Sequence, residues 1–190
     1  VIDSDLRRPG VHEVFGLPNK SGLTDLLRTA ELEIGSCLNG AGVENLHVIT
    51  SGAVPPNPSE LLSSPRMVQV LADLRQMADV VILDSSPALL VADATILSTR
   101  VDGIVLVVDA GRTHRDIARQ AVANLHQAGA KLLGAVLNRV SSTRESYYDR
   151  DAERAGRFSK KFANPPAAFA AARKAALSQF SALFRGRPGN

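Results

Sequence analysis

Three aspartates stand where two predicted strands end. Asp3 and Asp5 follow the apolar start of the chain with one residue between them, and Asp84 closes the run VVILD. In open parallel sheets ligands bind beyond the carboxyl ends of the strands, so these side chains are expected on one rim. Such carboxylates could hold Mg²⁺ with waters and phosphate oxygens, or one could accept a proton from an attacking hydroxyl. The alternative is that each caps the helix or turn that follows it.

The elements that must position these aspartates form a βα pattern. Short, nearly continuous apolar runs predict strands at 46–50, 80–84, 103–109 and 131–138, and Val1-Ile2 predicts the end of another. Helical patterns lie between them at about 22–29, 65–77, 92–99 and 113–128. This alternation predicts a parallel sheet. Because the runs do not alternate with polar residues, both faces of the sheet are expected to be covered by helices, giving a three-layer α/β fold.

Composition limits the classes of protein to consider. The chain has 190 residues, of which 45% are hydrophobic and 22% charged, as in ordinary globular domains. No apolar run approaches the roughly 18 residues that would cross a bilayer. The single cysteine, Cys37, excludes an internal disulfide, and no Cys/His cluster predicts zinc. The opening VIDSDLRRPG has neither an initiating Met nor the layout of a signal peptide, so we expect it to be the interior of a longer protein.

Charge divides the chain near residue 150. Residues 1–149 contain 13 Lys or Arg against 17 Asp or Glu, whereas residues 150–190 contain 9 against 2. We interpret 1–149 as the folded domain and 150–190 as a basic, Ala-rich tail that could be partly helical. Such a tail could bind nucleic acid or anionic lipid, dock on the domain through an amphipathic helix, or remain a solvated terminus.

The flanks of the three aspartates resemble motifs of the bacterial tyrosine kinases that act in capsule and exopolysaccharide synthesis. VIDSDLRRP resembles their Walker A′ motif, and VVILDSSP resembles their Walker B motif, with Ser86 where a proline is common. Further similar strings lie at 21–27, 51–67, 91–116 and 128–140, so the resemblance is almost continuous over residues 1–140. The loop PPNPSELL distinguishes the chain from related partitioning ATPases.

The resemblance implies a P-loop NTPase-like fold of the deviant Walker A, partitioning-ATPase-like superfamily, with ATP and Mg²⁺ as cofactors. Asp3 would be the base or orienting group for a tyrosine hydroxyl. Asp5 would assist Mg²⁺ directly or through water, and Asp84 would contact it through water. These roles suit phosphoryl transfer, which needs mainly positioning and charge neutralisation. Asn138 would read the adenine edge, although it could equally close a strand into a turn.

Other charged residues have less defined roles. The guanidinium groups of Arg7 and Arg8 could bind phosphate or a neighbouring subunit. Asp93, Asp102 and Asp109 are interpreted as structural or surface residues, because their spacing demands no site.

Two features of the family are missing or reduced. The family's Gly-rich phosphate loop with Gly-Lys-Ser/Thr, which holds the β- and γ-phosphates, does not occur in the sequence. We therefore expect an N-terminally truncated chain, lacking the Walker A strand, loop and helix, that alone neither binds ATP tightly nor catalyses. The family's tyrosine cluster is reduced to Tyr147 and Tyr148, which are either autophosphorylation sites or residues packed against the last helix.

The function implied is an autophosphorylating, non-specific protein-tyrosine kinase that regulates capsular or extracellular polysaccharide polymerisation and export. Its expected place is the cytoplasm, at the inner face of the plasma membrane. Implied partners are a chain-length-determinant-type membrane adaptor or a fused transmembrane half, further copies of the chain in a ring, and a cognate tyrosine phosphatase, with no specific nucleic acid. The alternatives are a catalytically inactive regulator of export with the same fold and a partitioning-type ATPase.

Overall fold

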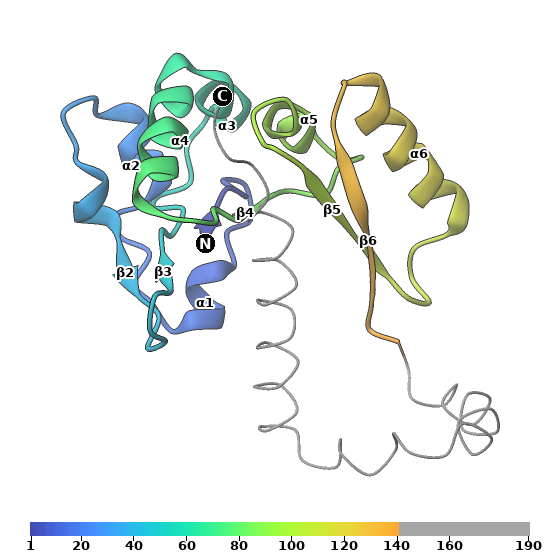
Figure 1. Ribbon diagram of the computed structural model, residues 1–190, viewed down its shortest axis with the longest axis horizontal. Helices are drawn as coiled ribbons and strands as arrows, with labels where there is room; N and C mark the ends of the chain where they lie inside the picture. Colours follow the sequence, from blue (N-terminus) through green and yellow to red (C-terminus); the bar gives the residue numbers. More distant parts are fainter. Residues whose placement is uncertain (141–190) are drawn as a thin grey trace, which may run out of the picture. The chain divides into compact units, whose positions relative to one another are not determined.

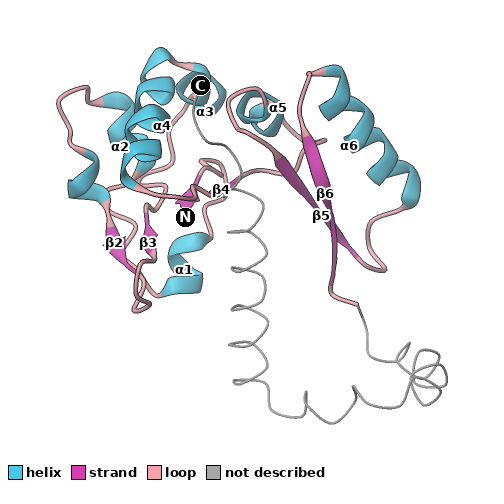
Figure 2. Cartoon of the chain, in the orientation of Figure 1, coloured by secondary structure: helices cyan, strands magenta, loops and turns pink. Residues whose placement is uncertain are grey.

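The computed structural model describes residues 1–140, in which helices and short strands follow one another along the chain (Figure 1, Figure 2). In chain order the elements are β1 Ile2–Asp3, α1 Val11–Phe15, α2 Leu23–Arg28, the 3₁₀ helix η1 Ile34–Cys37, β2 Asn39–Gly40, β3 His47–Val48, α3 Pro58–Ser63, α4 Pro65–Met77, β4 Leu83–Asp84, α5 Asp93–Ser98, β5 Ile104–Asp109, α6 Arg115–Gln127 and β6 Leu132–Asn138. The predicted boundary near 150 and the predicted tail lie outside the described residues. No helix within residues 1–140 is long and apolar enough to cross a membrane.

Strand β1 lies between two parallel neighbours. On one side it pairs with β4 in the register Ile2 to Leu83, and on the other Ile2 forms a parallel bridge with Ile49, just after β3. Backbone hydrogen bonds join the Asp3 N–H to the carbonyl of Ile49 at 2.9 Å and the Ser4 N–H to that of Asp84 at 2.8 Å. The predicted strands at 46–50 and 80–84 therefore flank the first strand. An antiparallel pairing of β2 with β3 was not predicted.

The second parallel pair, β5 and β6, runs in the register Val105 to Gly134 through Asp109 to Asn138. Helix α6 packs beside this pair (Figure 1). No hydrogen-bonded ladder among the described residues joins β4 to β5, so the strands are parallel as predicted but do not form one continuous sheet. Val107 is 60% exposed and Ile82 is 54% exposed. Apolar side chains of these strands therefore remain uncovered within residues 1–140, and the coverage of both faces by helices stays a prediction.

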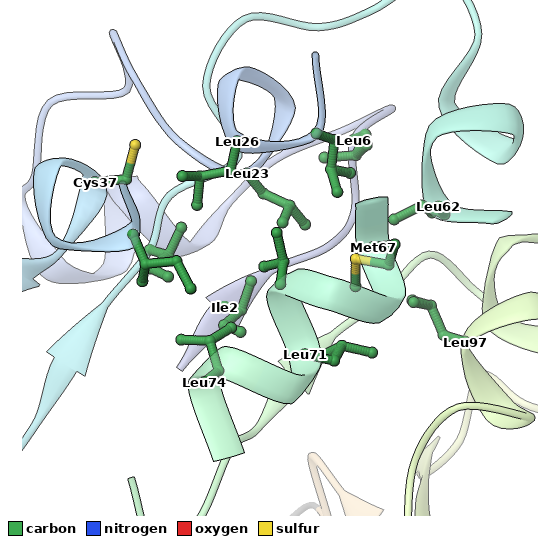
Figure 3. Close-up of a cluster of buried hydrophobic side chains, with 14 residues drawn as sticks. Ile2, Leu6, Leu23, Leu26, Cys37, Leu62, Met67, Leu71, Leu74 and Leu97 are labelled. Atoms are coloured by element: carbon green, nitrogen blue, oxygen red, sulfur yellow. The ribbon is translucent and has the colours of Figure 1, made fainter. Parts of the chain in front are cut away.

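The hydrophobic core is built around α4 (Figure 3). Ser64 caps this helix by accepting a hydrogen bond from the Met67 N–H at 3.2 Å, and Pro65 takes the first helical position, as its fixed φ allows. The buried face repeats at helical spacing through Met67, Val70, Leu71 and Leu74. It packs with other apolar side chains of the cluster, among them Ile2, Leu6, Leu23, Leu26 and Leu62. This core fixes β1 and its loop against the helices.

The four predicted helices occur within one or two residues of their predicted ends, as α2, α4, α5 and α6. Two short helices were not predicted. Helix α1 follows the Asp-x-Asp loop and ends at Gly16, whose φ of +64° is a left-handed cap that glycine adopts without strain. Helix α3 forms from the PPNPSELL loop, with Pro58 at its start. Both helices lie next to the loop that carries the aspartates.

Candidate active site

The parallel register brings the strand-end aspartates together. Asp3 and Asp84 are paired residues of β1 and β4, and Asp5 follows two residues after the end of β1. Their proximity is reflected in the pKa of Asp84, which burial raises and which the negative charges of Asp3 and Asp5 raise further. The structure thus places the three predicted site residues at one rim, at the carboxyl ends of β1 and β4.

Asp3 is completely buried and uses one carboxylate oxygen only. Its Oδ2 accepts hydrogen bonds from the backbone N–H groups of Gly10 at 3.1 Å and Val11 at 3.0 Å, at the start of α1. Its Oδ1 is buried with no hydrogen-bond partner among the described residues. Burial raises the pKa of Asp3; the N–H bonds oppose this and the charge of Asp5 adds to it. Asp3 therefore caps the start of α1, which was the alternative to a catalytic role, and its other carboxylate oxygen has no hydrogen-bond partner.

Asp5 is held by three donors on a single oxygen. Its Oδ1 accepts the backbone N–H groups of Arg7 at 3.2 Å and Arg8 at 3.0 Å, and the hydroxyl of Ser86 at 2.6 Å. The other oxygen, Oδ2, has no hydrogen bond within residues 1–140. The carboxylate is consequently fixed in direction while one oxygen stays available to a ligand.

Asp84 is the most exposed of the three carboxylates. Partial desolvation is the main cause that raises its pKa, and the negative charges of Asp3 and Asp5 raise it further. A cation at this rim would relieve that repulsion.

A magnesium ion fits these residues only with help from other ligands. In the part of the chain that the structure describes, no three His, Cys, Asp or Glu side chains are close enough to hold a metal ion by themselves. Mg²⁺ is usually bound through one or two carboxylates, with waters and substrate phosphates completing its octahedron. Oδ2 of Asp5, which accepts no hydrogen bond within residues 1–140, and the exposed carboxylate of Asp84 are suitable donors for that kind of site.

Arg7 turns toward the protein instead of toward a ligand. Its Nε lies 2.7 Å from Oδ2 of Asp93, which is fully buried, and its Nη2 lies 2.9 Å from the hydroxyl of Ser59. Ser59 in turn donates to Oδ1 of Asp93 at 2.6 Å. Burial alone would raise the pKa of Asp93, but the hydrogen bonds from Arg7 and Ser59 outweigh it and hold the pKa below its usual range. The interpretation of Asp93 as structural is consistent with this contact.

Asn138 ends β6, paired in register with Asp109 at the end of β5. Its Oδ1 accepts the N–H of Arg139 at 2.9 Å, and Arg139 has a φ of +55°, in the left-handed region. The Arg139 guanidinium lies 3.0 Å from Oδ2 of Asp109. Asn138 therefore closes the strand into a turn, while its contact with adenine stays a prediction. Tyr147 and Tyr148 lie outside the described residues.

Sequence reasoning did not identify the residues that support the aspartates. Ser59, Ser86 and Asp93 come from three separate segments, and each contacts the loop that carries Asp5 or the arginine beside it. Two signals were available. Ser86 is the position where the Walker B-like string departs from its usual proline, and Ser59 lies in the distinctive PPNPSELL loop.

Comparison with known proteins adds independent evidence. The putative tyrosine-protein kinase CapB of Staphylococcus aureus is 37% identical over 148 residues, which are 78% of this chain and 64% of CapB. The tyrosine-protein kinase YwqD of Bacillus subtilis is 42% identical, over 78% of this chain and 62% of YwqD. The chain thus spans less than two thirds of the length of these relatives. No model of a known protein family matches it.

Solved structures of kinase domains are also similar to this chain. The kinase domain of VpsO matches with a TM-score of 0.69 and 35% identity, over 74% of this chain and 69% of that domain. The kinase domain of the Escherichia coli tyrosine kinase ETK matches with a TM-score of 0.68 and 38% identity, over 72% of this chain and 53% of that structure. With the Asp-x-Asp loop, the strand-end Asp84 and the parallel strands in place, the chain belongs to the bacterial tyrosine kinase family.

Proposed function

We propose that this protein is an ATP-dependent, autophosphorylating protein-tyrosine kinase, and that residues 1–140 supply the carboxylate side of its active site. The observation that carries the proposal is the bare, buried Oδ1 of Asp3, beside Asp5 and Asp84 at the ends of paired parallel strands. An unpartnered buried carboxylate oxygen is costly, and such groups gather at functional sites.

On this proposal each carboxylate has its own task. Asp3 is the base or orienting group for the incoming tyrosine hydroxyl, and its Oδ2 is fixed by the start of α1. Asp5 and Asp84 hold the Mg²⁺ ion or its waters, and Asn138 meets the nucleotide base. When bound, Mg²⁺ neutralises the charge on the transferring phosphoryl group. The chain's own contribution is positioning, which the three hydrogen bonds on Oδ1 of Asp5 supply.

The phosphate loop would come from a strand, loop and helix outside these 190 residues. Two observations support this. Strands β4 and β5 each have one edge with no ladder partner within residues 1–140. Apolar side chains on these segments, Ile82, Val105 and Val107, remain exposed. A further parallel strand between β4 and β5 would join the two strand pairs into one sheet, and the helix that follows this strand could cover exposed apolar residues on one face, as in a three-layer fold of the deviant Walker A type.

The biological role that we propose is control of capsular or extracellular polysaccharide polymerisation and export. The resemblance of the motifs around Asp3, Asp5 and Asp84 to those of the bacterial tyrosine kinases that act in capsule and exopolysaccharide synthesis supports this. We place the protein in the cytoplasm at the inner face of the plasma membrane. A chain-length-determinant-type adaptor or fused transmembrane half, a ring of like subunits and a tyrosine phosphatase would be its partners. Tyr147 and Tyr148 are the proposed phosphorylation sites.

The test uses the full-length protein with ATP and Mg²⁺, probed for phosphotyrosine. Asp3→Ala should reduce the signal by at least about 100-fold, as removal of a group that handles the reacting proton does. Asp102→Ala is the matched control, since Asp102 is 81% exposed and pairs with Arg75 at the surface, and its signal should equal that of wild type. Equal signal in Asp3→Ala and wild type would refute the role of Asp3. No signal in a folded wild-type protein would favour the inactive regulator instead.

A further inference from the structure

Ser86 occupies an unusual place for a loop serine. It lies two residues beyond Asp84, yet it is only 4% exposed. Its hydroxyl donates to Oδ1 of Asp5 at 2.6 Å, across 81 residues of sequence. A bond from a hydroxyl to a carboxylate is charge-assisted and about twice as strong as a neutral one. The contact therefore ties the loop after β4 to the loop after β1.

The hydroxyl completes the set of donors that fixes Asp5. The other two donors, the N–H groups of Arg7 and Arg8, belong to Asp5's own loop and move with it. Ser86 is thus the donor that connects the Asp5 carboxylate to a different segment, the loop that follows β4, and β4 ends with Asp84. With Oδ1 occupied, Oδ2 is the oxygen that remains for a ligand.

A second anchor holds the same loop from the other side. Arg7 contacts the buried carboxylate of Asp93 with its Nε at 2.7 Å, which attaches the loop to the start of α5. Ser85, the neighbour of Ser86, is exposed, and its hydroxyl makes only a long contact of 3.4 Å to the Ser86 carbonyl. The adjacent serines therefore differ in burial and in contact with Asp5, which makes Ser85 a matched control.

We propose that Ser86 is a positioning residue: its hydroxyl holds Asp5 in register with Asp84 so that both carboxylates can serve one magnesium ion. The expected effect of Ser86 on catalysis rests on the proposed kinase function. The expected effect of Ser86 on the position of the Asp5 loop does not depend on that function. Groups that orient a metal ligand typically change metal affinity or activity by 10- to 100-fold when they are removed.

The experiment compares Ser86→Ala, Ser86→Thr and Ser85→Ala in the full-length protein. The first measurement is hydrogen exchange at the Arg7 and Arg8 amides, which bond to the carboxylate that Ser86 holds. Ser86→Ala should speed their exchange by roughly threefold or more, because local opening becomes easier. Ser86→Thr keeps the hydroxyl and should exchange like wild type, as should Ser85→Ala. This readout needs neither nucleotide nor activity.

The second measurement is the dependence of autophosphorylation on Mg²⁺. Ser86→Ala should raise the Mg²⁺ concentration for half-maximal rate by roughly tenfold while leaving the KM for ATP within about twofold. Wild-type behaviour of Ser86→Ala in both measurements would overturn the proposal. So would an equal loss in Ser86→Thr or Ser85→Ala, since shape or loop disturbance would then be the cause.

The two proposals fail in different ways. If no variant, wild type included, forms phosphotyrosine, the kinase function fails while the exchange measurement still decides whether Ser86 positions Asp5. Should Ser86→Ala not fold, Ser86→Cys carries the same test, because a thiol fills similar space but is a weak donor.

Discussion

Replacement of Asp93 by alanine should destabilise the protein far more than replacement of any exposed aspartate. Asp93 is fully buried, and its carboxylate accepts hydrogen bonds from Arg7 at 2.7 and 3.3 Å and from Ser59 at 2.6 Å. A hydrogen bond to a charged group contributes about 1.5–3 kcal/mol, but the three are not additive and part is offset by the cost of burying the carboxylate. We expect a net loss of about 2–3 kcal/mol in the free energy of unfolding.

Thermal and urea unfolding measure this loss. In a folded unit of this size, about 1 kcal/mol corresponds to roughly 4 °C, so the melting temperature should fall by about 8–12 °C. Asp102→Ala is again the matched control, because Asp102 also pairs with an arginine but at the surface, at 3.3 Å. Exposed pairs contribute little, so its effect should stay within about 0.5 kcal/mol. Equal losses in the two variants would refute the argument that burial makes the Asp93 contact important.

The pH dependence gives a second check on Asp93. Its pKa in the folded protein lies below its ordinary value, so its stabilising contribution is fully present above the unfolded pKa of about 3.9. The contribution is lost as pH falls through the lower, folded pKa. The difference between wild type and Asp93→Ala should therefore be the same at pH 7 and pH 5 and should shrink only below about pH 4. A difference that disappears between pH 7 and pH 5 would contradict this assignment.

Three further outcomes are expected from the same structure. Asp3→Asn should abolish autophosphorylation of the full-length protein yet melt no lower than wild type at pH 7. Burial raises the pKa of Asp3, so its ionised form is unfavourable in the folded protein above the folded pKa, and the difference in melting temperature between the variant and wild type should disappear below about pH 4. Gly22→Ala should cost about 3 kcal/mol in urea unfolding, since a Cβ there overlaps a backbone carbonyl, whereas Gly35→Ala meets no atom within 4 Å and should be nearly neutral. Met67→Ala should cost about 2–5 kcal/mol, and Met77→Ala, 55% exposed on the same helix, should cost less than about 0.5 kcal/mol; similar losses would exclude the assigned core.

Much of the local structure was predictable because the relevant signals are local. The helical pattern over 65–77 and Pro65 at its start predicted α4, and the position of Asp3 and Asp84 on one rim followed from two strand-end aspartates in a βα pattern. The predicted coverage of apolar strands on both faces is not seen at Ile82 and Val107 within residues 1–140. An apolar run indicates that a strand is buried by neighbouring elements, but it does not identify those elements.

The supporting contacts of the site were not predictable for a different reason. The bond between Ser86 and Asp5 joins residues 81 positions apart, and the Arg7 contact with Asp93 joins residues 86 positions apart. Neither pairing has a periodic signature, because each depends on how two loops meet after the strands have paired. The serine at position 86, where the family commonly has a proline, showed that this position is unusual, but it did not indicate that Asp5 is the residue that Ser86 contacts.

The two aspartates of the Asp-x-Asp motif are held by the same principle with different donors. Asp3 is fixed through Oδ2 by the start of α1, and Asp5 is fixed through Oδ1 by its own loop and Ser86, so each carboxylate uses one oxygen for structure. A carboxylate anchored at both oxygens would have fewer lone pairs left for a ligand, and one anchored at neither would lose orientation. The buried, unpartnered oxygen of Asp3 persists because the core beneath β1 fixes the backbone that carries it. The oxygens left without partners therefore lower the stability of the folded protein, and the hydrogen bonds that orient the same carboxylates offset part of that loss.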